Sequence, residues 1–493
     1  MVGVGFYSRR HVKSVDGFVL GGRSVGPWLT AFAYGTSYFS AVVFVGYAGQ
    51  FGWKYGIAST WIGIGNALIG SLLAWVVLGR RTKVMTQHLR AKTMPDFFGQ
   101  RYGSKALKIV ASVIVFVFLI PYTASVYNGL SRLFGMAFNI PYTWCVIAMA
   151  VFTAIYVILG GYMATAINDF IQGIIMLFGI VAVIASVLNG QGGFMEAVSK
   201  MAQIPSDVPA TMGQPGAFTS FFGPDPLNLL GVVILTSLGT WGLPQMIGKF
   251  YAIKDEKSIN TGTVISTLFA IVISGGCYFL GGFGRLFDSA EIYNAETGAV
   301  VYDSIIPSML SKLPDILIGI VVVLVLSASM STLSSLVLTS SSTMTLDLLK
   351  DNIMKEMSEK KQIITMQILI VFFIVVSVVI ALDPPTFIAQ LMGISWGALA
   401  GAFLAPFLYG LYWKGVTRAG VWAGFIAGVG ITVSNMFIGY IASPINAGAA
   451  AMVAGLVIVP LVSLVTPKLK KEDVDEIFTC YEEKVVSTKK RNL

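Results

Sequence analysis

Long apolar runs recur along this chain of 493 residues, and only short bursts of charged residues separate them. Each run has about 20 residues or more, which is the length that an α-helix needs to cross the hydrocarbon core of a bilayer. Hydrophobic residues make up 55% of the chain and charged residues 12%, whereas soluble domains have about 25% charged residues. The chain is therefore predicted to be an all-α integral membrane protein.

Twelve apolar helices are predicted, in two groups. The first group covers residues 28–51, 56–79, 106–135, 142–160, 163–190 and 227–249. The second group covers residues 257–285, 314–346, 362–382, 386–412, 417–440 and 443–466. Residues 1–26 begin with an apolar stretch that is too short to span. We expect this segment to be the remnant of a thirteenth membrane helix followed by a cytoplasmic loop, and the alternative is a short interfacial segment.

Lysine and arginine are distributed very unevenly between alternate loops. Of the 33 basic residues, 28 lie on one side, where Lys249 is counted as the start of a loop, and 5 lie on the other. The positive-inside rule places the basic side in the cytoplasm, together with the tail at 467–493. This predicts a multi-pass protein of the plasma (inner) membrane with a cytoplasmic C-terminus, so the net charge of +9 requires no nucleic-acid partner. The longest outer loops, 191–226 and 286–313, are expected to be non-helical caps over the bundle.

Few residues are suited to metal or acid-base chemistry inside the membrane. The cysteines Cys145, Cys277 and Cys480 have no metal-ligand spacing, and we interpret them as packing residues. The two histidines, His11 and His88, fall in predicted polar loops. The C-terminal tail is too short to form a catalytic domain. An enzyme is therefore not expected.

Two of the predicted helices contain residues that interrupt helices. Residues 33–40 place a glycine among hydroxyl side chains in the middle of the helix at 28–51. Residues 239–245 contain two glycines and Pro244, which removes a helix hydrogen bond. Each interrupted helix opens a set of five in the predicted order. Interruptions at corresponding places in two halves are typical of the binding site of an inverted-repeat transporter.

A serine-rich segment at 327–335 lies within the helix predicted at 314–346. Ala328, Ser331 and Thr332 are spaced i, i+3 and i+4, so the alanine carbonyl side and two hydroxyl groups share one helix face. Oxygen ligands without thiol or imidazole suit a hard cation. The alternative is that these hydroxyl groups bond back to carbonyl groups of their own helix or permit close helix packing.

Asp169 is the carboxylate best placed within a predicted membrane segment, near the cytoplasmic start of the helix at 163–190. A carboxylate at this position is either a helix cap or part of a cation pathway, because ionisable residues inside a membrane are commonly functional. We favour the cation pathway.

Three segments, taken together, resemble the sodium:solute symporter family. They are residues 18–27 (FVLGGRSVGP), 160–165 (GGYMAT) and 328–334 (ASMSTLS), which occur in the family's order at the expected helices. The resemblance runs from Gly17 to about Pro467 and is nearest to the sodium/proline and sodium/pantothenate symporters.

The resemblance implies a leucine-transporter-like fold with peripheral helices around an inverted five-plus-five helix core. The two five-helix repeats would cover residues 28–190 and 227–412, and two peripheral helices would cover residues 417–466. It also implies Na+ as the coupling ion, with no organic cofactor. The implied sodium ligands are the carbonyl groups of Thr36, Phe39 and Ala328 and the hydroxyl groups of Ser331 and Thr332, and Asp169 matches the family's aspartate on the sodium route.

The resemblance leaves the substrate open. Tyr122 falls where proline carriers have a binding-site tyrosine. The chain departs from those carriers at Tyr38, where they have an aspartate, and at Thr236 and Thr240, where they have aromatic residues. The neighbourhood of Tyr38 is more similar to the pantothenate branch, so a small carboxylate or amino acid is expected.

The predicted function is sodium-coupled import of a small organic solute by alternating access. Sodium would tie the helix at 314–346 to the interrupted helix at 28–51, and the substrate would bind between the two interrupted helices. The expected substrate-binding residues are Ser37, Tyr38, Tyr122, Thr240, Trp241, Pro244 and Gln245. The expected partners are the solute and the lipid bilayer, and a monomer is compatible with these features. The alternatives are a proton-coupled or sugar-carrying member of the same fold, a channel, and a membrane sensor or enzyme built on a transporter-like bundle.

Overall fold

The computed structural model describes residues 2–9, 13–138 and 140–482. The side chains of Val2, Tyr38 and Met136 lie outside the described part, as do His11 and the end of the predicted tail at 483–493. Helices make up nearly all of the described chain, whose β pairing consists of two isolated bridges. The prediction of an all-α protein is confirmed.

The helices follow one another closely along the chain. In the first half they are α1 (Val2–Ser8), α2 (Val15–Leu20), α3 (Pro27–Tyr38), α4 (Ala48–Tyr55), α5 (Thr60–Gly65), α6 (Arg80–His88), α7 (Met94–Tyr102), α8 (Lys105–Phe138), α9 (Tyr142–Gly190) and α10 (Phe194–Gln203). In the second half they are α11 (Pro226–Gly239), α12 (Pro244–Ala252), α13 (Glu256–Ala270), α14 (Gly276–Gly281), α15 (Ile305–Leu310), α16 (Asp315–Thr343), α17 (Glu359–Leu382), α18 (Ile388–Tyr412), α19 (Arg418–Ile438), α20 (Pro444–Val465) and α21 (Lys471–Phe478). π-helical turns extend or join several of them, at Val42–Tyr47, Asn66–Leu73, Trp75–Gly79, Ile271–Gly275 and Met344–Ile353.

Ten helical stretches in the described chain are long and apolar enough to cross a membrane. The two longest, Val42–His88 with 47 residues and Tyr142–Gly190 with 49 residues, are more than twice as long as one crossing needs, because a helix rises about 1.5 Å per residue and the hydrocarbon core is about 30 Å thick. Glycines with positive φ divide them, namely Gly56 (φ 60°) and Gly161 (φ 52°). With these divisions, a helical segment lies at each of the twelve predicted positions.

Both predicted interruptions are present. α3 ends at Tyr38 because Phe39 is extended, with φ −96° and ψ 113°, and helical structure resumes two residues later. α11 ends at Gly239, and α12 begins at Pro244 after a short turn. Proline suits the first position of a helix because its missing N–H would have had no helical partner there. Non-helical backbone at membrane depth is tolerated only where protein or an aqueous cavity surrounds it.

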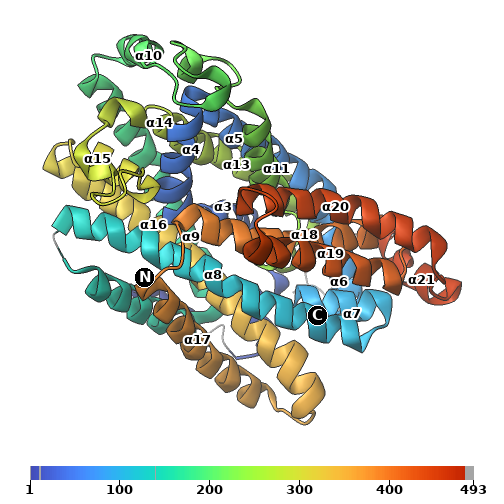
Figure 1. Ribbon diagram of the computed structural model, residues 1–493. Coiled ribbons are helices and arrows are strands. Elements are labelled where there is room, and N and C mark those ends of the chain that lie inside the picture. The colour runs from blue at the N-terminus through green and yellow to red at the C-terminus, as the bar shows by residue number, and fades with distance from the viewer. Residues whose placement is uncertain (1, 10–12, 139, 483–493) are drawn as a thin grey trace.

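Several segments predicted as loops contain short helices, so those predictions were wrong in detail. α6 and α7 lie within residues 80–108, α10 lies in the outer loop at 191–226, and α15 lies in the outer loop at 286–313. These helices have six to ten residues, so a search for apolar runs of membrane-spanning length does not find them. Figure 1 shows α10 and α15 at one end of the bundle and α6, α7 and α21 at the other, as the alternation of loops requires.

α18 is the most enclosed of the membrane helices, with 94% of its apolar window buried. It packs against α8, α19 and α20. A Cβ built on Gly428 of α19 would lie 2.1 Å from the backbone nitrogen of Ala402 in α18. Small residues allow such close approach of helix backbones in a membrane, where lipid provides little hydrophobic drive for association. All three cysteines are buried.

The end of the bundle that holds α10 and α15 contains a buried carboxylate. Asp303 is 1% exposed, and its Oδ2 accepts a hydrogen bond of 3.3 Å from the backbone N–H of Ile388, at the start of α18. The same oxygen lies 3.9 Å from Nε of Arg132 in α8. Burial raises the pKa of Asp303 to about 6, although Arg132 and the Ile388 N–H favour the charged form. The charge that links these segments is therefore sensitive to mild acid.

Asp303→Asn is expected to flatten the pH dependence of thermal stability. The folded pKa of about 6 lies above the unfolded value of about 3.9, so the folded state binds this proton more tightly. The carboxyl group therefore favours folding most below about pH 4, and its contribution falls by about 3 kcal/mol as the pH rises through about 6. Unfolding midpoints measured from pH 4.5 to 7.5 should fall less steeply for Asp303→Asn than for the wild type and for the exposed control Glu296→Gln. Equal slopes for all three proteins would contradict the assignment.

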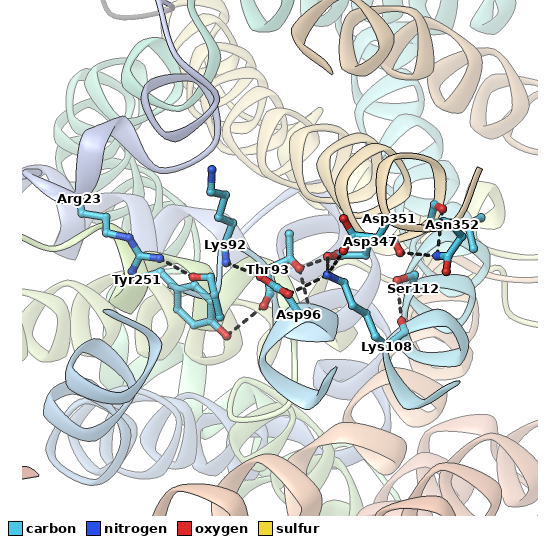
Figure 2. A network of polar contacts seen from close by, with 12 residues as sticks. Arg23, Lys92, Thr93, Asp96, Lys108, Ser112, Tyr251, Asp347, Asp351 and Asn352 are labelled. Carbon is cyan, nitrogen blue, oxygen red and sulfur yellow. Dashed lines mark hydrogen bonds and ion pairs between the residues drawn. The ribbon is translucent and has the colours of Figure 1, made fainter. Parts of the chain in front are cut away.

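Figure 2 shows a polar cluster beside α7 and α8, centred on Lys108. Nζ of Lys108 lies 2.7 Å from Oδ1 of Asp96 in α7 and 3.3 Å from Oδ1 of Asp347, in the π-helical turn after α16. Asp351 from the same turn lies 2.5 Å from Nζ, and Thr93 donates a hydrogen bond to Asp347. One ammonium group thus holds together carboxylates from two segments that are far apart in the sequence.

Lys108→Met is expected to destabilise the folded protein by about 2 kcal/mol. The change leaves Asp96 and Asp347 close together without their shared cation, and Asp347 is 1% exposed. The expected effect is below the range for fully buried ion pairs because the lysine side chain is 13% exposed. The unfolding midpoint in detergent should drop, whereas Lys105→Met, an exposed lysine of the same helix, should leave it nearly unchanged. Equal midpoints for both variants would show that the cluster contributes little.

Candidate functional site

The hydroxyl group of Thr332 in α16 lies among three carbonyl oxygens at the break after α3. Its Oγ1 is 3.1 Å from the carbonyl oxygen of Thr36, 3.3 Å from that of Phe39 and 3.2 Å from that of Ala328. The last carbonyl groups of a helix have no partner within it, so ending α3 at Tyr38 makes carbonyl oxygens available here. The contact with Ala328 lies within α16, as expected if the hydroxyl group only bonds to a carbonyl group of its own helix. The contacts with Thr36 and Phe39 join α16 to the break after α3, which that alternative does not explain.

Ser331 adds a second hydroxyl group to this cluster. Its Oγ donates a hydrogen bond of 2.8 Å to Oγ1 of Thr36, and Thr36 in turn donates one of 2.8 Å to the carbonyl group of Phe32. Thr36, Ser331 and Thr332 are fully buried. The structure thus brings together all five residues predicted as sodium ligands. They offer only hydroxyl and carbonyl oxygens, which are the ligands that hard cations prefer.

Asp169 in α9 faces a lysine that the loop count placed outside the bundle. Asp169 is 0% exposed, and its Oδ2 lies 4.0 Å from Nζ of Lys249. The assignment of Lys249 to a loop was wrong, because α12 continues to Ala252 and the Lys249 side chain is 3% exposed. The cap interpretation of Asp169 is also wrong, since the residue lies about two turns beyond the kink at Gly161.

Lys249 connects Asp169 to the break in α3. Its Nζ donates a hydrogen bond of 3.1 Å to Oγ of Ser335 and lies 5.1 Å from the centre of the Tyr162 ring. Oγ of Ser335 is in turn 2.9 Å from Oγ of Ser37. A chain of polar contacts therefore runs through α9, α12, α16 and α3. Sequence reasoning missed Lys249, although its i, i+4 spacing from Gln245 places both on one face of α12.

The second break is attached to the π-helical turn Asn66–Leu73. Oγ1 of Thr240 donates a hydrogen bond of 3.0 Å to the carbonyl group of Gly70, and Nε1 of Trp241 donates one of 3.0 Å to that of Ile69. The hydroxyl group of Tyr34 in α3 donates to the same carbonyl group of Gly70, at 2.7 Å. Both interrupted segments thus meet at one irregular turn, and turns of this type often occur at functional sites.

Tyr122 in α8 reaches the second break through a tryptophan. It is fully buried, and its ring meets that of Trp396 in α18 edge-on, with the ring centroids 5.9 Å apart. A Cβ built on Gly239, the last residue of α11, would lie 2.6 Å from the Trp396 ring. Trp396 therefore lies between Tyr122 and the end of α11. The sequence analysis missed it because a tryptophan within an apolar helix has no distinguishing spacing.

Pro244 and Gln245 line a cavity of about 40 Å³ between α12 and α16. Lys249 and Ser335 also line it, whereas Ser37, Thr240 and Trp241 do not. The structure thus does not bring the predicted substrate residues to one cavity. It divides them between this cavity, the Tyr122 and Trp396 contact, and the π-helical turn. Tyr38 stands at the end of α3, and its side chain lies outside the described part.

Comparisons with known proteins agree with this architecture. The sequence matches the profile of the sodium:solute symporter family over residues 18–428. Sodium/proline symporters of Staphylococcus aureus, including those of strains JH9 and NCTC 8325 / PS 47, are 30% identical to it, over 96% of this chain and 91% of theirs.

Two solved structures show the same fold. A Na+-coupled sialic acid symporter in a substrate-bound outward-open state superposes with a TM-score of 0.74 at 14% identity, covering 95% of this chain and 96% of that one. MHP1, a nucleobase-cation-symport-1 family transporter, gives a TM-score of 0.52 at 14% identity, covering 93% and 98%. The predicted leucine-transporter-like fold is confirmed. The chain is a multi-pass membrane transporter rather than an enzyme, and it belongs to the sodium:solute symporter family.

Proposed function

We propose that this protein imports a small organic solute together with sodium by alternating access. The observation that carries the proposal is the oxygen cluster at the break in α3, where the Thr332 hydroxyl lies within 3.3 Å of three carbonyl oxygens. The Staphylococcus relatives are named sodium/proline symporters, which supports both a sodium ion and an amino acid or a similar carboxylate. Pantothenate is the second candidate solute.

Sodium would be held by the carbonyl groups of Thr36, Phe39 and Ala328 and by the hydroxyl groups of Ser331 and Thr332. Two of the carbonyl groups belong to the α3 break and the other three ligands to α16, so an ion shared among them draws these segments together. Asp169, a fully buried carboxylate of α9, would lie on the path of the ion. We also assign the two inverted five-helix repeats to residues 28–190 and 227–412.

The solute would bind between the two breaks. Ser37 and Tyr38 belong to the first break, Thr240, Trp241, Pro244 and Gln245 to the second, and Tyr122 faces Trp396 across from them. These residues line different spaces in the present conformation, so they would have to come together in another state of the transport cycle. Alternating access involves rearrangements of this kind between states. The basic side of the bundle, with the C-terminal tail, would face the cytoplasm of a cell whose plasma membrane holds the protein.

The membrane potential supplies part of the driving force. One sodium ion that moves inward across 100 mV gains about 2.3 kcal/mol. This free energy corresponds to about fortyfold accumulation of solute for each ion, before the sodium concentration gradient is added.

Uptake of labelled proline, pantothenate and several sugars into proteoliposomes tests the proposal. Each solute is offered with an inward sodium gradient and with choline in its place, at one fixed pH on both sides. Sodium-driven uptake of one carboxylate or amino acid is expected. Uptake that favours a sugar would contradict the proposed substrate class. Uptake that is equally fast in choline would contradict sodium as the coupling ion.

A further inference from the structure

A small cavity lies beside α12, at the end of the bundle that holds α6 and α7. Its volume is about 40 Å³. One wall is the face of α12 that carries Gln245 and Lys249, and the opposite wall is the face of α16 from Ser335 to Thr343. The segment leading into α7, which includes Lys92, and residues of α2 and α9 complete the lining. The space is large enough for a carboxylate group or a few water molecules.

Both charged side chains that line this cavity are basic. Lys92 and Lys249 both line it, and none of its described lining residues is an aspartate or glutamate. Lys92 pairs with Asp16 at 2.8 Å and is 30% exposed, so its charge is partly neutralised and partly hydrated. Lys249 is 3% exposed, and its partner Asp169, 4.0 Å away, does not line the cavity, so the ammonium group is the charge of this pair that borders the space. An anion is the ligand that complements such a lining.

Two further polar groups in the lining are buried without hydrogen bonds. Gln245 is 2% exposed, and neither its amide nitrogen nor its amide oxygen has a hydrogen-bond partner within the described chain. The hydroxyl group of Thr343, which is 1% exposed, has none there either. Leaving a buried donor unpaired costs about 1–3 kcal/mol. An anion bound beside Lys249 would accept a hydrogen bond from Gln245, one turn away on α12, and remove this penalty there.

The ammonium group of Lys249 also has capacity for a ligand. A lysine ammonium carries three N–H donors. Among the described residues it makes one hydrogen bond, to Ser335, and its distance of 4.0 Å from Oδ2 of Asp169 exceeds hydrogen-bond length. Lys249 thus stands between a carboxylate of the protein on one side and an anion-sized cavity on the other.

We propose that this cavity is an anion subsite that binds the carboxylate group of the transported solute, with Lys249 and Gln245, one turn apart on α12, as its donors. The inference rests on the proposed function and narrows its substrate class to carboxylates. A free inorganic anion presents the same chemistry, and competition by chloride distinguishes it from the carboxylate of the solute.

The position of Lys249 also connects the solute to the ion. Asp169 and Lys249 together are neutral. A carboxylate bound to Lys249 adds a negative charge to a buried site, whereas a sodium ion near Asp169 adds a positive one. Binding both restores neutrality, and uncompensated charge is costly in a buried site. Sodium is therefore expected to raise the affinity for the carboxylate.

The test measures binding to the purified full-length chain in detergent, with labelled pantothenate and labelled proline as probes. Competitors are unlabelled pantothenate, proline, their uncharged counterparts panthenol and prolinamide, and chloride. The variants are Lys249→Met, Lys249→Arg and Gln245→Leu, with the exposed Lys257→Met as the control. Each is measured in sodium and in choline, after elution profiles and unfolding midpoints have established that it is folded.

The subsite predicts that at least one of the two carboxylates binds, and that its uncharged counterpart competes at least about tenfold more weakly, the effect of one charge-assisted hydrogen bond. Lys249→Met should weaken binding by about tenfold or more, and Gln245→Leu by less. Lys257→Met should remain close to the wild type, and Lys249→Arg should retain more binding than Lys249→Met because it keeps the positive charge. If Lys249→Met does not fold, two measurements still show whether the subsite binds a carboxylate. One compares each solute with its uncharged counterpart, and the other uses the Gln245→Leu variant.

Three results would overturn the subsite. The first is that neither carboxylate binds, and the second is that a carboxylate and its uncharged counterpart compete equally well. The third is that chloride competes as strongly as the carboxylate, which would assign the cavity to a free inorganic anion. If carboxylate binding depends on Lys249 but is equal in sodium and in choline, the subsite is supported and the proposed sodium coupling is contradicted. Failure of the subsite and failure of sodium coupling are therefore distinguishable.

Discussion

Replacing Ser331 and Thr332 together with alanine is expected to abolish sodium-driven uptake. The two hydroxyl groups are the only side-chain ligands of the proposed sodium site, and each contacts an oxygen of Thr36 across the interface between α16 and α3. An interaction of a hydroxyl group with an ion contributes about 1.5–3 kcal/mol. Losing both should raise the sodium concentration for half-maximal uptake by more than about 100-fold.

Initial uptake rates over a series of sodium concentrations measure this effect. Ser377→Ala is the matched control, because Ser377 is a buried serine of α17 whose hydroxyl donates to the carbonyl group of Phe373, one turn earlier in the same helix. It should behave as the wild type does. A double variant that folds and keeps the wild-type sodium dependence would show that the oxygen cluster serves helix packing alone, which was the alternative interpretation of the serine-rich segment.

Neutralising either partner of the Asp169 and Lys249 pair is expected to destabilise the protein strongly. Asp169→Asn leaves a buried ammonium group without its carboxylate, and Lys249→Met leaves a buried carboxylate without its cation. Breaking a buried ion pair in this way costs about 3–5 kcal/mol. The double variant Asp169→Asn, Lys249→Met has no buried charge at this place and should recover most of the lost stability.

Unfolding midpoints of the four proteins in detergent form a double-mutant cycle that measures this coupling. The double variant should fold nearly as well as the wild type yet fail in sodium-driven uptake, because both the ion path and the anion subsite have lost their charged groups. Additive losses of stability would mean that Asp169 and Lys249 act independently. Normal uptake by the double variant would exclude both groups from the transport mechanism.

The membrane crossings and their interruptions could be predicted from the sequence because both depend on local properties. A crossing requires about 20 apolar residues in a row, and glycine or proline within such a run weakens the helix at that place. Pro244 is the first residue of α12, and the break after α3 falls among the residues that suggested it. Local sequence properties did not predict that Thr36 lies beside Ser331 and Thr332. That contact was implied by the family resemblance and not by spacing within either segment.

Contacts between distant segments could not be predicted in the same way. Lys249 looked like the first charge of a loop, and only the packing of α12 against α9 and α16 shows that its side chain lies inside the bundle. Trp396 had no sequence signal for its place between Tyr122 and α11. The short helices α6, α7, α10 and α15 were missed because a hydropathy argument recognises only segments that can span the membrane.

Uptake under controlled ion gradients tests the central claim, sodium coupling, most directly. Proteoliposomes that contain the wild-type chain receive the labelled solute under a sodium gradient with equal pH on both sides, and separately under an inward proton gradient with sodium absent. Accumulation driven by the sodium gradient alone, and its loss in the Ser331→Ala, Thr332→Ala variant, is the predicted result. Accumulation driven by the proton gradient in the absence of sodium would contradict it.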